Sequence, residues 1–211
     1  MKKIICFALA AIAALSLVSC GAKAPDIEAV RDELVALVEA SYEVNEIFFG
    51  EGLPTYARGG EYDKKYGLYN GNDSEFAFYE YVTQESKYYF TEQIRWAAEK
   101  VYTADYLKGI YTMAFDGYAD ENTGAVTTAR YLDANGLLMK YVFDENDPFD
   151  HLDGKKRRFD FDTMEAVKPY SSGYLNISVD SYLEGNESDI LNITLHFKKT
   201  ADGWRLDAPT Y

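Results

Sequence analysis

The chain has 211 residues, of which 21 are Lys or Arg and 35 are Asp or Glu, so its formal charge at pH 7 is −14. Hydrophobic residues make up 47% of the chain, which excludes a disordered acidic tail because such tails are poor in apolar residues. The acidity argues against binding to nucleic acid, since phosphate recognition needs clustered Lys and Arg. The length fits one domain.

The first twenty residues have the pattern of an export signal. Lys2 and Lys3 precede an almost wholly apolar, uncharged run at 4–18. That run is shorter than the roughly 20 apolar residues that a membrane-spanning helix needs. A positive start, a short apolar stretch and small residues after it are typical of a secretory signal peptide. We therefore predict a signal peptide at 1–20, a short tether at 21–26 and a single domain at 27–211.

The apolar run ends in Leu17-Val18-Ser19-Cys20, and Gly21 follows. This segment resembles the lipobox of bacterial lipoproteins, and every position of that motif fits. In that family the Cys thiol receives a diacylglyceryl group, and cleavage leaves the Cys as the first mature residue. The resemblance implies that lipidation of Cys20 anchors the domain to the cell membrane, on its extracytoplasmic face. An ordinary secreted protein with a chance Cys is the alternative.

Cysteine usage agrees with export of a domain without thiols. The only two cysteines are Cys6, inside the predicted signal, and Cys20. The predicted mature chain therefore has no thiol for a disulfide, a thiolate metal site or a Cys nucleophile. Loss of Lys2 and Lys3 leaves 19 basic and 35 acidic residues, a formal charge of −16. Anionic lipid repels such a domain, so we expect the acyl chains to provide the membrane attachment.

The first part of the domain is predicted to contain a helix, a loop and a short strand. Residues 27–49 show helical spacing, with an apolar stripe formed by Ile27, Val30, Leu34, Leu37, Val38 and Phe48. Gly50 is expected to end this helix. Residues 55–74 are rich in Gly, Tyr, Asp and Asn and are predicted to form a loop. Alternation over 76–82 favours a strand, with a helix as the second choice.

A second helix is predicted at 91–108, with a buried face made by Ile94, Ala97, Ala98, Val101 and Ala104. Trp96 and Trp204 are both predicted to lie in the core. After Gly109 the period changes to two, and strands are predicted at 111–118, 127–132, 137–143, 158–161, 174–183, 190–198 and 204–206. The later strands alternate apolar and polar side chains, which is typical of an antiparallel sheet with one face on a core.

Helices first and a meandering sheet last indicate an α+β fold, in which N-terminal helices pack on a curved, mostly antiparallel sheet. Residues 193–207, with their Asp202-Gly203-Trp204 turn, resemble the closing hairpin of the nuclear-transport-factor-2-like superfamily. The resemblance implies a cone-shaped domain with helices packed into the sheet. That superfamily hosts isomerases, dehydratases and many non-catalytic domains. The linker between the two helices is longer here than such cones usually carry.

Few residues point to catalytic chemistry. His151 and His196 are the only histidines. His196 shares the polar face of its strand with Lys198, so we predict that it points away from the helices. Asp160 and Asp162 alternate with phenylalanines and share one sheet face. A buried carboxylate pair could act in acid–base chemistry, whereas an exposed pair is simply the solvated face of a strand.

The best metal candidate is an oxygen-rich segment whose potential ligands are Asp144, Asn146, Asp147, Asp150 and Asp153. Oxygen ligands at close spacing suit Ca²⁺. The segment departs from the EF-hand pattern because Pro148 and Phe149 stand where a ligand and the turn Gly belong. A solvated acidic turn is the alternative. No cofactor is predicted.

Two further patterns are candidates for contact with a ligand or partner. The basic run at 155–158 (Lys155, Lys156, Arg157 and Arg158) could bind an anionic partner, or it could neutralise the acidic segment beside it. In the Gly-rich loop stand Tyr56, Tyr62, Tyr66 and Tyr69. Tyrosine combines a rigid apolar ring with a polar tip, so these side chains could form a contact surface or a second small core.

These patterns favour a lipid-anchored cell-envelope protein with a non-catalytic binding domain. Its partner would be an unknown envelope protein or small ligand, and not nucleic acid. One alternative is a cone-fold enzyme of the isomerase or hydrolyase type, with a pocket carboxylate as base. Another is an inhibitor of a cell-wall hydrolase, since residues 102–106 (Tyr-Thr-Ala-Asp-Tyr) resemble part of small secreted inhibitors of that kind. A titratable side chain pointing into a closed apolar pocket would favour the enzyme.

Overall fold

The computed structural model describes residues 26–66, 76–119, 126–142, 149, 152 and 155–211. Its helices are α2 (Arg31–Phe49), α3 (Glu61–Tyr66), α4 (Thr91–Glu99) and α5 (Ala104–Tyr111), with a π-helical turn η1 (Thr112–Asp116) after α5. Its strands are β1 (Tyr79–Tyr81), β2 (Tyr118–Ala119), β3 (Val126–Thr127), β4 (Tyr131–Ala134), β5 (Leu137–Tyr141), β6 (Arg157–Val167), β7 (Tyr174–Leu183), β8 (Asn186–Thr200) and β9 (Gly203–Leu206). Within these ranges no helix has both the length and the apolar character needed to cross a membrane.

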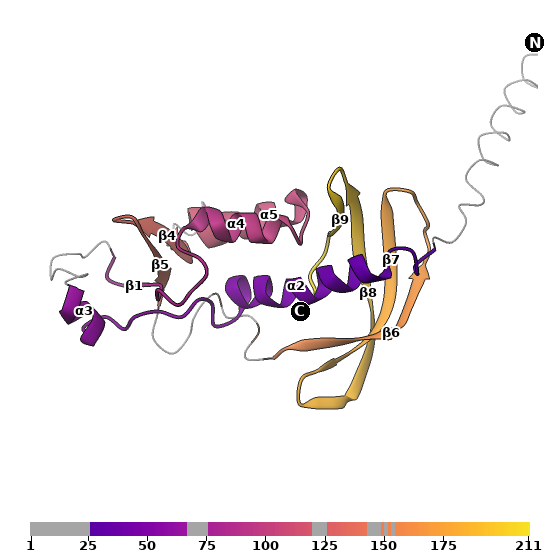
Figure 1. Cartoon of the computed structure of the whole chain (residues 1–211), viewed down its shortest axis with the longest axis horizontal. Helices are drawn as coiled ribbons and strands as arrows, with labels where there is room; N and C mark the ends of the chain where they lie inside the picture. Colours follow the sequence, from indigo (N-terminus) through magenta and orange to yellow (C-terminus); the bar gives the residue numbers. More distant parts are fainter. Residues whose placement is uncertain (1–25, 67–75, 120–125, 143–148, 150–151, 153–154) are drawn as a thin grey trace, which may run out of the picture.

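The fold is α+β, as the order of elements predicts, and its strands are divided among separate antiparallel sheets. A four-stranded sheet has the order β6-β7-β8-β9, a three-stranded sheet has the order β1-β5-β4, and β2 pairs with β3. Figure 1 shows an elongated molecule with the four-stranded sheet at one end and the three-stranded sheet toward the other. The helix α2 runs between them, so both ends of this helix help to position the sheets.

Helix α2 forms where the apolar stripe is predicted and ends at Gly50, as expected. Leu34, Val38 and Phe48 on this stripe are fully or almost fully buried. At the other end of the chain, the backbone N–H of Trp204 donates to the Glu33 carboxylate at 2.8 Å. This bond ties the first turns of α2 to β9, which lies far away in the sequence.

The predicted helix at 91–108 is wrong in one respect, because the chain forms two helices with a break at 100–103. The backbone N–H of Thr103 donates to the Leu206 carbonyl, and the N–H of Leu206 donates to the Val101 carbonyl. The break therefore provides backbone partners for β9. Thr103 then caps α5 by accepting from the Tyr106 N–H at 3.2 Å. Ala104, predicted to be buried, is exposed at the start of α5.

The predicted strand at 111–118 is also wrong except at Tyr118, which begins β2. Tyr111 ends α5, and η1 follows it. The rings of Tyr111 and Phe115 lie on one face, where both contact Phe48 with ring centroids 6.3 and 5.8 Å away. Two residues that are four positions apart lie on the same face of a helix. The packing of this face against α2 therefore outweighs the alternating pattern, which had predicted a strand. The predicted loop at 55–74 likewise contains the short helix α3.

Trp96 is not a core residue, because its side chain is 62% exposed. The buried positions of α4 are Ile94 and Ala98, two residues to either side of it. Two residues correspond to about 200° around a helix, so Trp96 faces the opposite way. Trp204 is 7% exposed, which confirms the prediction for that residue.

The late hairpins agree with their predicted positions. β7 has the predicted bounds, and β8 and β9 contain the predicted segments. Ile177 and Val179 on β7 and Leu195 on β8 face a large core that also contains residues of α2, α4 and α5. A second, smaller core under the three-stranded sheet is formed by Tyr79, Tyr81 and Met139.

Candidate functional site

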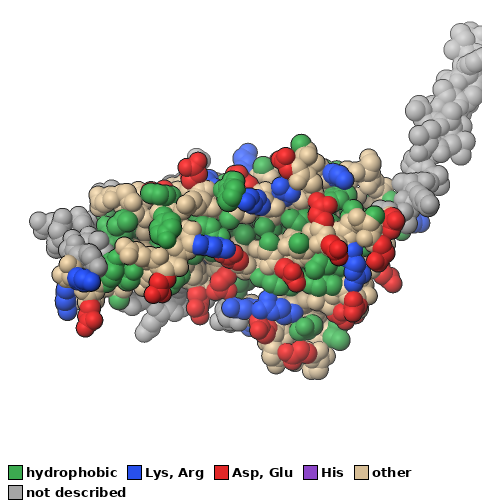
Figure 2. Space-filling view, in the orientation of Figure 1, with side chains coloured by type: hydrophobic (Ala, Val, Ile, Leu, Met, Phe, Trp, Pro, Cys, Tyr) green, Lys and Arg blue, Asp and Glu red, His purple; other side chains and the backbone are tan. Residues whose placement is uncertain are grey.

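A cleft of about 250 Å³ lies between α2, the start of β6 and the C-terminal residues. Its lining consists of Tyr42, Glu43, Asn45, Glu46, Leu152, Lys155, Lys156, Arg157, Arg158, Thr210 and Tyr211. We call this cavity the basic cleft because the whole basic run at 155–158 lines it. Figure 2 shows Lys and Arg side chains gathered beside the start of β6. The basic cleft thus combines four cations with two carboxylates in a chain whose formal charge is −14.

Both carboxylates of the cleft are already engaged. Glu46 lies 3.6 Å from the Lys156 ammonium and also accepts from the backbone N–H of Glu51 at 3.0 Å. Glu43 accepts from Lys87 at 2.5 Å and from the Tyr88 hydroxyl at 3.0 Å. Because these contacts engage the two acidic side chains, the basic run is the main charge of the cleft.

Arg158 packs on an aromatic wall of the cleft. Its guanidinium carbon lies 4.6 Å from the centre of the Tyr42 ring, and its Nη2 donates to Glu184 at 2.8 Å. The Tyr42 ring in turn lies parallel to the ring of Phe159, with centroids 6.3 Å apart. Burial raises the pKa of the Tyr42 hydroxyl, and the neighbouring Arg158 partly opposes this shift. Tyr42 therefore stays protonated at neutral pH.

Arg157 is held differently, by a buried hydroxyl. Its Nη1 donates to Ser181 Oγ at 2.9 Å, and Ser181 on β7 is fully buried. The Ser181 hydroxyl donates its own proton to the Leu191 carbonyl at 2.8 Å. Within the described ranges, no carboxylate lies within ion-pair distance of Arg157. The guanidinium is therefore fixed in the lining of the cleft by a neutral hydroxyl, with no negative partner among the described residues.

The back of the cleft is a closed hydrogen-bond network. Thr210 Oγ1 accepts from Asn45 Nδ2 at 2.8 Å and lies 2.7 Å from Ser41 Oγ and 3.0 Å from the Tyr102 hydroxyl. The Tyr102 hydroxyl donates to Asn45 Oδ1 at 2.7 Å. Burial raises the pKa of Tyr102 to about 12. This network joins the C-terminal segment to α2, beside which Figure 1 places the C-terminus.

A second hollow, of about 370 Å³, lies between α2 and α4. Its lining includes Val44, Val101 and the exposed Trp96. The Lys100 ammonium lies 3.1 Å from the centre of the Trp96 ring, so a cation directly after α4 already covers that ring.

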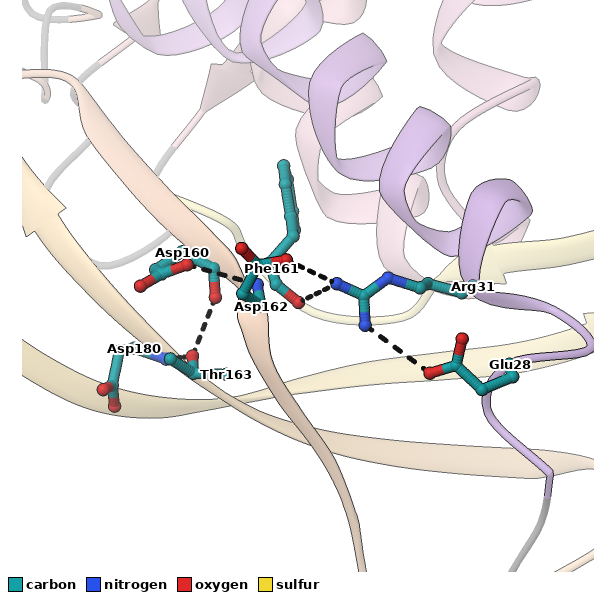
Figure 3. Close-up of polar contacts among 7 residues, drawn as sticks. All are labelled: Glu28, Arg31, Asp160, Phe161, Asp162, Thr163 and Asp180. Carbon is teal, nitrogen blue, oxygen red and sulfur yellow. Dashed lines mark hydrogen bonds and ion pairs between the residues drawn. The ribbon is translucent and has the colours of Figure 1, made fainter.

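The carboxylate pair of β6 is exposed and lies where the register between β6 and β7 shifts, and Figure 3 shows its polar contacts. Asp160 accepts from the backbone N–H of Asp162 at 3.1 Å, and the Asp162 side chain is 96% exposed. Arg31 from the start of α2 donates to the Phe161 carbonyl at 2.6 Å and to Asp162 at 3.1 Å. The two carboxylates thus lie on the solvent-exposed face of the strand, and the contacts with Arg31 fix this part of β6 to α2.

The remaining predicted site residues have mixed outcomes. His196 is exposed on the sheet face away from the core, as predicted, with Nδ1 2.8 Å from Asn176 Oδ1. Among the residues that the structure describes, no group of three or more His, Cys, Asp or Glu is placed to hold a metal ion. The candidate ligands Asp144, Asn146, Asp147, Asp150 and Asp153 lie outside the described residues, as do His151 and the lipidation candidate Cys20.

Of the tyrosines in the Gly-rich loop, the structure describes the side chains of Tyr56 and Tyr62, and neither of these lines the basic cleft. Tyr56 packs against the second, smaller core, and its ring stacks on Tyr62 with centroids 3.6 Å apart. Its hydroxyl accepts from the backbone N–H of Gln84 at 3.0 Å. The side chain of Tyr66 and the whole of Tyr69 lie outside the described residues. A contact role for these four tyrosines stays a prediction.

Sequence reasoning identified the basic run but missed the residues that make it a cleft. Tyr42, Ser181 and Thr210 come from α2, β7 and the C-terminal segment. No local pattern connects these positions with residues 155–158. The one available signal was four consecutive cations in an acidic chain.

Comparison with known proteins identifies no relative of this chain. No protein-family model, curated protein or solved structure matches the chain.

Proposed function

We propose that the chain is a lipid-anchored lipoprotein of the cell envelope whose domain binds a small ligand or partner without catalysing a reaction. The observation that carries the binding role is the basic cleft, a cavity of about 250 Å³ lined by four cations in an otherwise acidic chain. The predicted signal peptide and the lipobox-like Leu17-Val18-Ser19-Cys20 support the location.

The chemistry of the cleft favours binding over catalysis. A general base must be free to take a proton near neutral pH. Glu46 is engaged by Lys156 and a backbone N–H, and Glu43 by Lys87 and Tyr88. The raised pKa of Tyr42 makes its hydroxyl a hydrogen-bond donor rather than a base. The lining therefore provides donors, cations and rings, which are groups that hold a ligand.

The test of anchoring is mass spectrometry of the mature protein made from the full chain in a bacterial host. We expect an N-terminal Cys20 that carries a diacylglyceryl group, and recovery in the membrane fraction. Cys20→Ser should release the protein from that fraction. Cys6→Ser is the matched control, because Cys6 lies in the segment that is removed, and this variant should remain anchored. An intact Met1, or a cleaved product without acyl chains, would contradict the proposal.

The test of the binding role uses the same domain without its lipid. Compounds extracted from envelope preparations are added to the wild-type domain and to Tyr42→Ala, and native mass spectrometry records bound mass. We expect a bound species with the wild type that is lost or weakened in Tyr42→Ala. Tyr174→Ala is the control, since Tyr174 is exposed on β7 and does not line the cleft. Turnover of an extracted compound by the domain would favour the enzyme instead.

A further inference from the structure

Resting on the proposed binding role, we propose that the basic cleft recognises a small organic anion, and that the guanidinium of Arg157 binds its carboxylate or phosphate group. The cleft as a whole indicates only that a ligand fits. The chemical class follows from the way in which Arg157 is held.

The position of Arg157 is fixed before any ligand arrives. Ser181 Oγ accepts from Nη1 at 2.9 Å and donates to the Leu191 carbonyl at 2.8 Å, so the hydroxyl orientation is set by β8. Ser181 itself is fully buried. One nitrogen of the guanidinium is thereby used, and Nε with Nη2 forms the remaining fork. Such a fork matches the two oxygens of a carboxylate or phosphate.

Among the residues that the structure describes, no carboxylate pairs with the charge of Arg157. Lys156 has Glu46 at 3.6 Å, and Arg158 has Glu184 at 2.8 Å. Arg157 has the neutral Ser181 hydroxyl instead. Its neighbours in sequence are both cations, so the local potential favours a negative group at this point. An anion on Arg157 would provide a countercharge that the described residues do not.

The size and walls of the cleft suit a small molecule. A volume of about 250 Å³ equals that of about eight water molecules at about 30 Å³ each. The Tyr42 ring lines one side, and Tyr211, whose ring lies 4.6 Å from Phe49, lines another. These rings suit an apolar or planar part of the ligand. The formal charge of −14 repels polyanionic surfaces over longer distances, which favours a small anion over a membrane or a nucleic acid.

The experiment follows the Arg157 Nε–H signal by ¹H–¹⁵N NMR while anions are added to the domain at low ionic strength. Phenyl phosphate, benzoate and inorganic phosphate are the probes, and benzyl alcohol is the neutral probe. The signal is assigned by its absence from the spectrum of Arg157→Lys. We expect a saturable shift with at least one of the aromatic anions and none with benzyl alcohol. The comparison of phenyl phosphate with benzoate identifies the preferred group, and inorganic phosphate tests whether the ring contributes.

Calorimetry with the better probe then compares three variants. Arg157→Gln should lower the affinity by about 10- to 100-fold, because a charge-assisted hydrogen-bond pair is lost. Arg157→Lys keeps the charge but loses the fork, so it should also weaken binding. Lys108→Gln removes one charge from the exposed face of α5 and should leave the affinity unchanged. Circular dichroism of each variant checks that it is folded.

Three results would overturn the proposal. The wild-type Arg157 signal could fail to shift with every anion, the affinity could be equal in Arg157→Gln and wild type, or Lys108→Gln could weaken binding as much as Arg157→Gln. The wild-type titration does not depend on the folding of any variant. If the anion titration fails, the proposed anchoring and the binding of an uncharged ligand are unaffected. If Cys20 is not lipidated, the proposed location is contradicted, but the result of the anion titration is unaffected.

Discussion

The fully buried guanidinium of Arg130 donates a hydrogen bond to the carbonyl oxygen of Gly50, at the C-terminal end of α2. A second bond from Arg130 reaches the Phe48 carbonyl at 3.1 Å. The last carbonyls of a helix have no partner within the helix, and a cation there also complements the helix dipole. Beside it, the Tyr131 hydroxyl donates to the Ile47 carbonyl at 3.0 Å. The end of α2 is thereby joined to the three-stranded sheet.

Replacement of Arg130 should strongly destabilise the fold. Arg130→Gln removes charged donors from two buried carbonyls, and we expect the free energy of unfolding to fall by about 2–4 kcal/mol. Urea denaturation followed by circular dichroism measures this change. Lys108→Gln removes the same charge from an exposed position and should change it by less than about 0.5 kcal/mol. Equal stabilities of the two variants would show that the Arg130 contacts do not hold the end of α2.

The network around Thr210 should be cooperative. Thr210→Val keeps the shape but leaves the buried Asn45 amide without its acceptor, at a cost of about 1–3 kcal/mol in unfolding free energy. Tyr102→Phe removes the donor to Asn45 Oδ1. Because both residues contact Asn45, the double variant should lose less than the sum of the two single losses. Strict additivity in urea denaturation would show that the two bonds act independently.

The two tryptophans should respond in opposite ways to substitution. Trp204→Ala empties a buried site and should cost about 3–5 kcal/mol, whereas Trp96→Ala should change stability by less than about 1 kcal/mol. Fluorescence provides an independent measurement. In a Trp204→Phe protein, iodide should strongly quench the fluorescence of the remaining Trp96. In a Trp96→Phe protein, it should quench the fluorescence of Trp204 only weakly. Similar quenching of both residues would contradict the exposure of Trp96.

Alkaline pH should destabilise the protein because buried tyrosines resist ionisation. Burial raises the pKa of Tyr102 from 10.0 to about 12, and it also raises the pKa of Tyr79 and Tyr111. Below pH 10 these hydroxyls are neutral in both states, so the stability from their burial is fully present. Above pH 10 the unfolded chain ionises first, and stability is lost at up to about 1.4 kcal/mol per pH unit for each group, until the folded pKa is passed.

Urea denaturation between pH 8 and pH 12 measures this alkaline loss. Tyr102→Phe should reduce its slope above pH 10. Tyr174→Phe, at an exposed position, should leave the slope unchanged. A free energy of unfolding that stays constant to pH 12 would contradict the predicted effect of burial.

Local pattern was sufficient for much of the fold. The alternation in β7 and β8 predicted their positions because each strand has one face on the core. The apolar stripe predicted α2 for the same reason, and Gly50 predicted its end. The errors arose where a distant partner decides the conformation. Residues 101–103 leave the helix to bond with Leu206, and Tyr111 and Phe115 form a helical pair on Phe48.

The sequence by itself determined the α+β class, the order of most elements and the charge of the run at 155–158, because periodicity and charge are properties of neighbouring residues. The lipobox-like segment that ends at Cys20 is likewise a pattern of neighbouring residues. Only the tertiary structure decided that this run faces Tyr42 and that Ser181 holds Arg157. A cleft requires side chains from separate elements to meet, and the pairing of β6 with β7 and the packing of α2 bring them together.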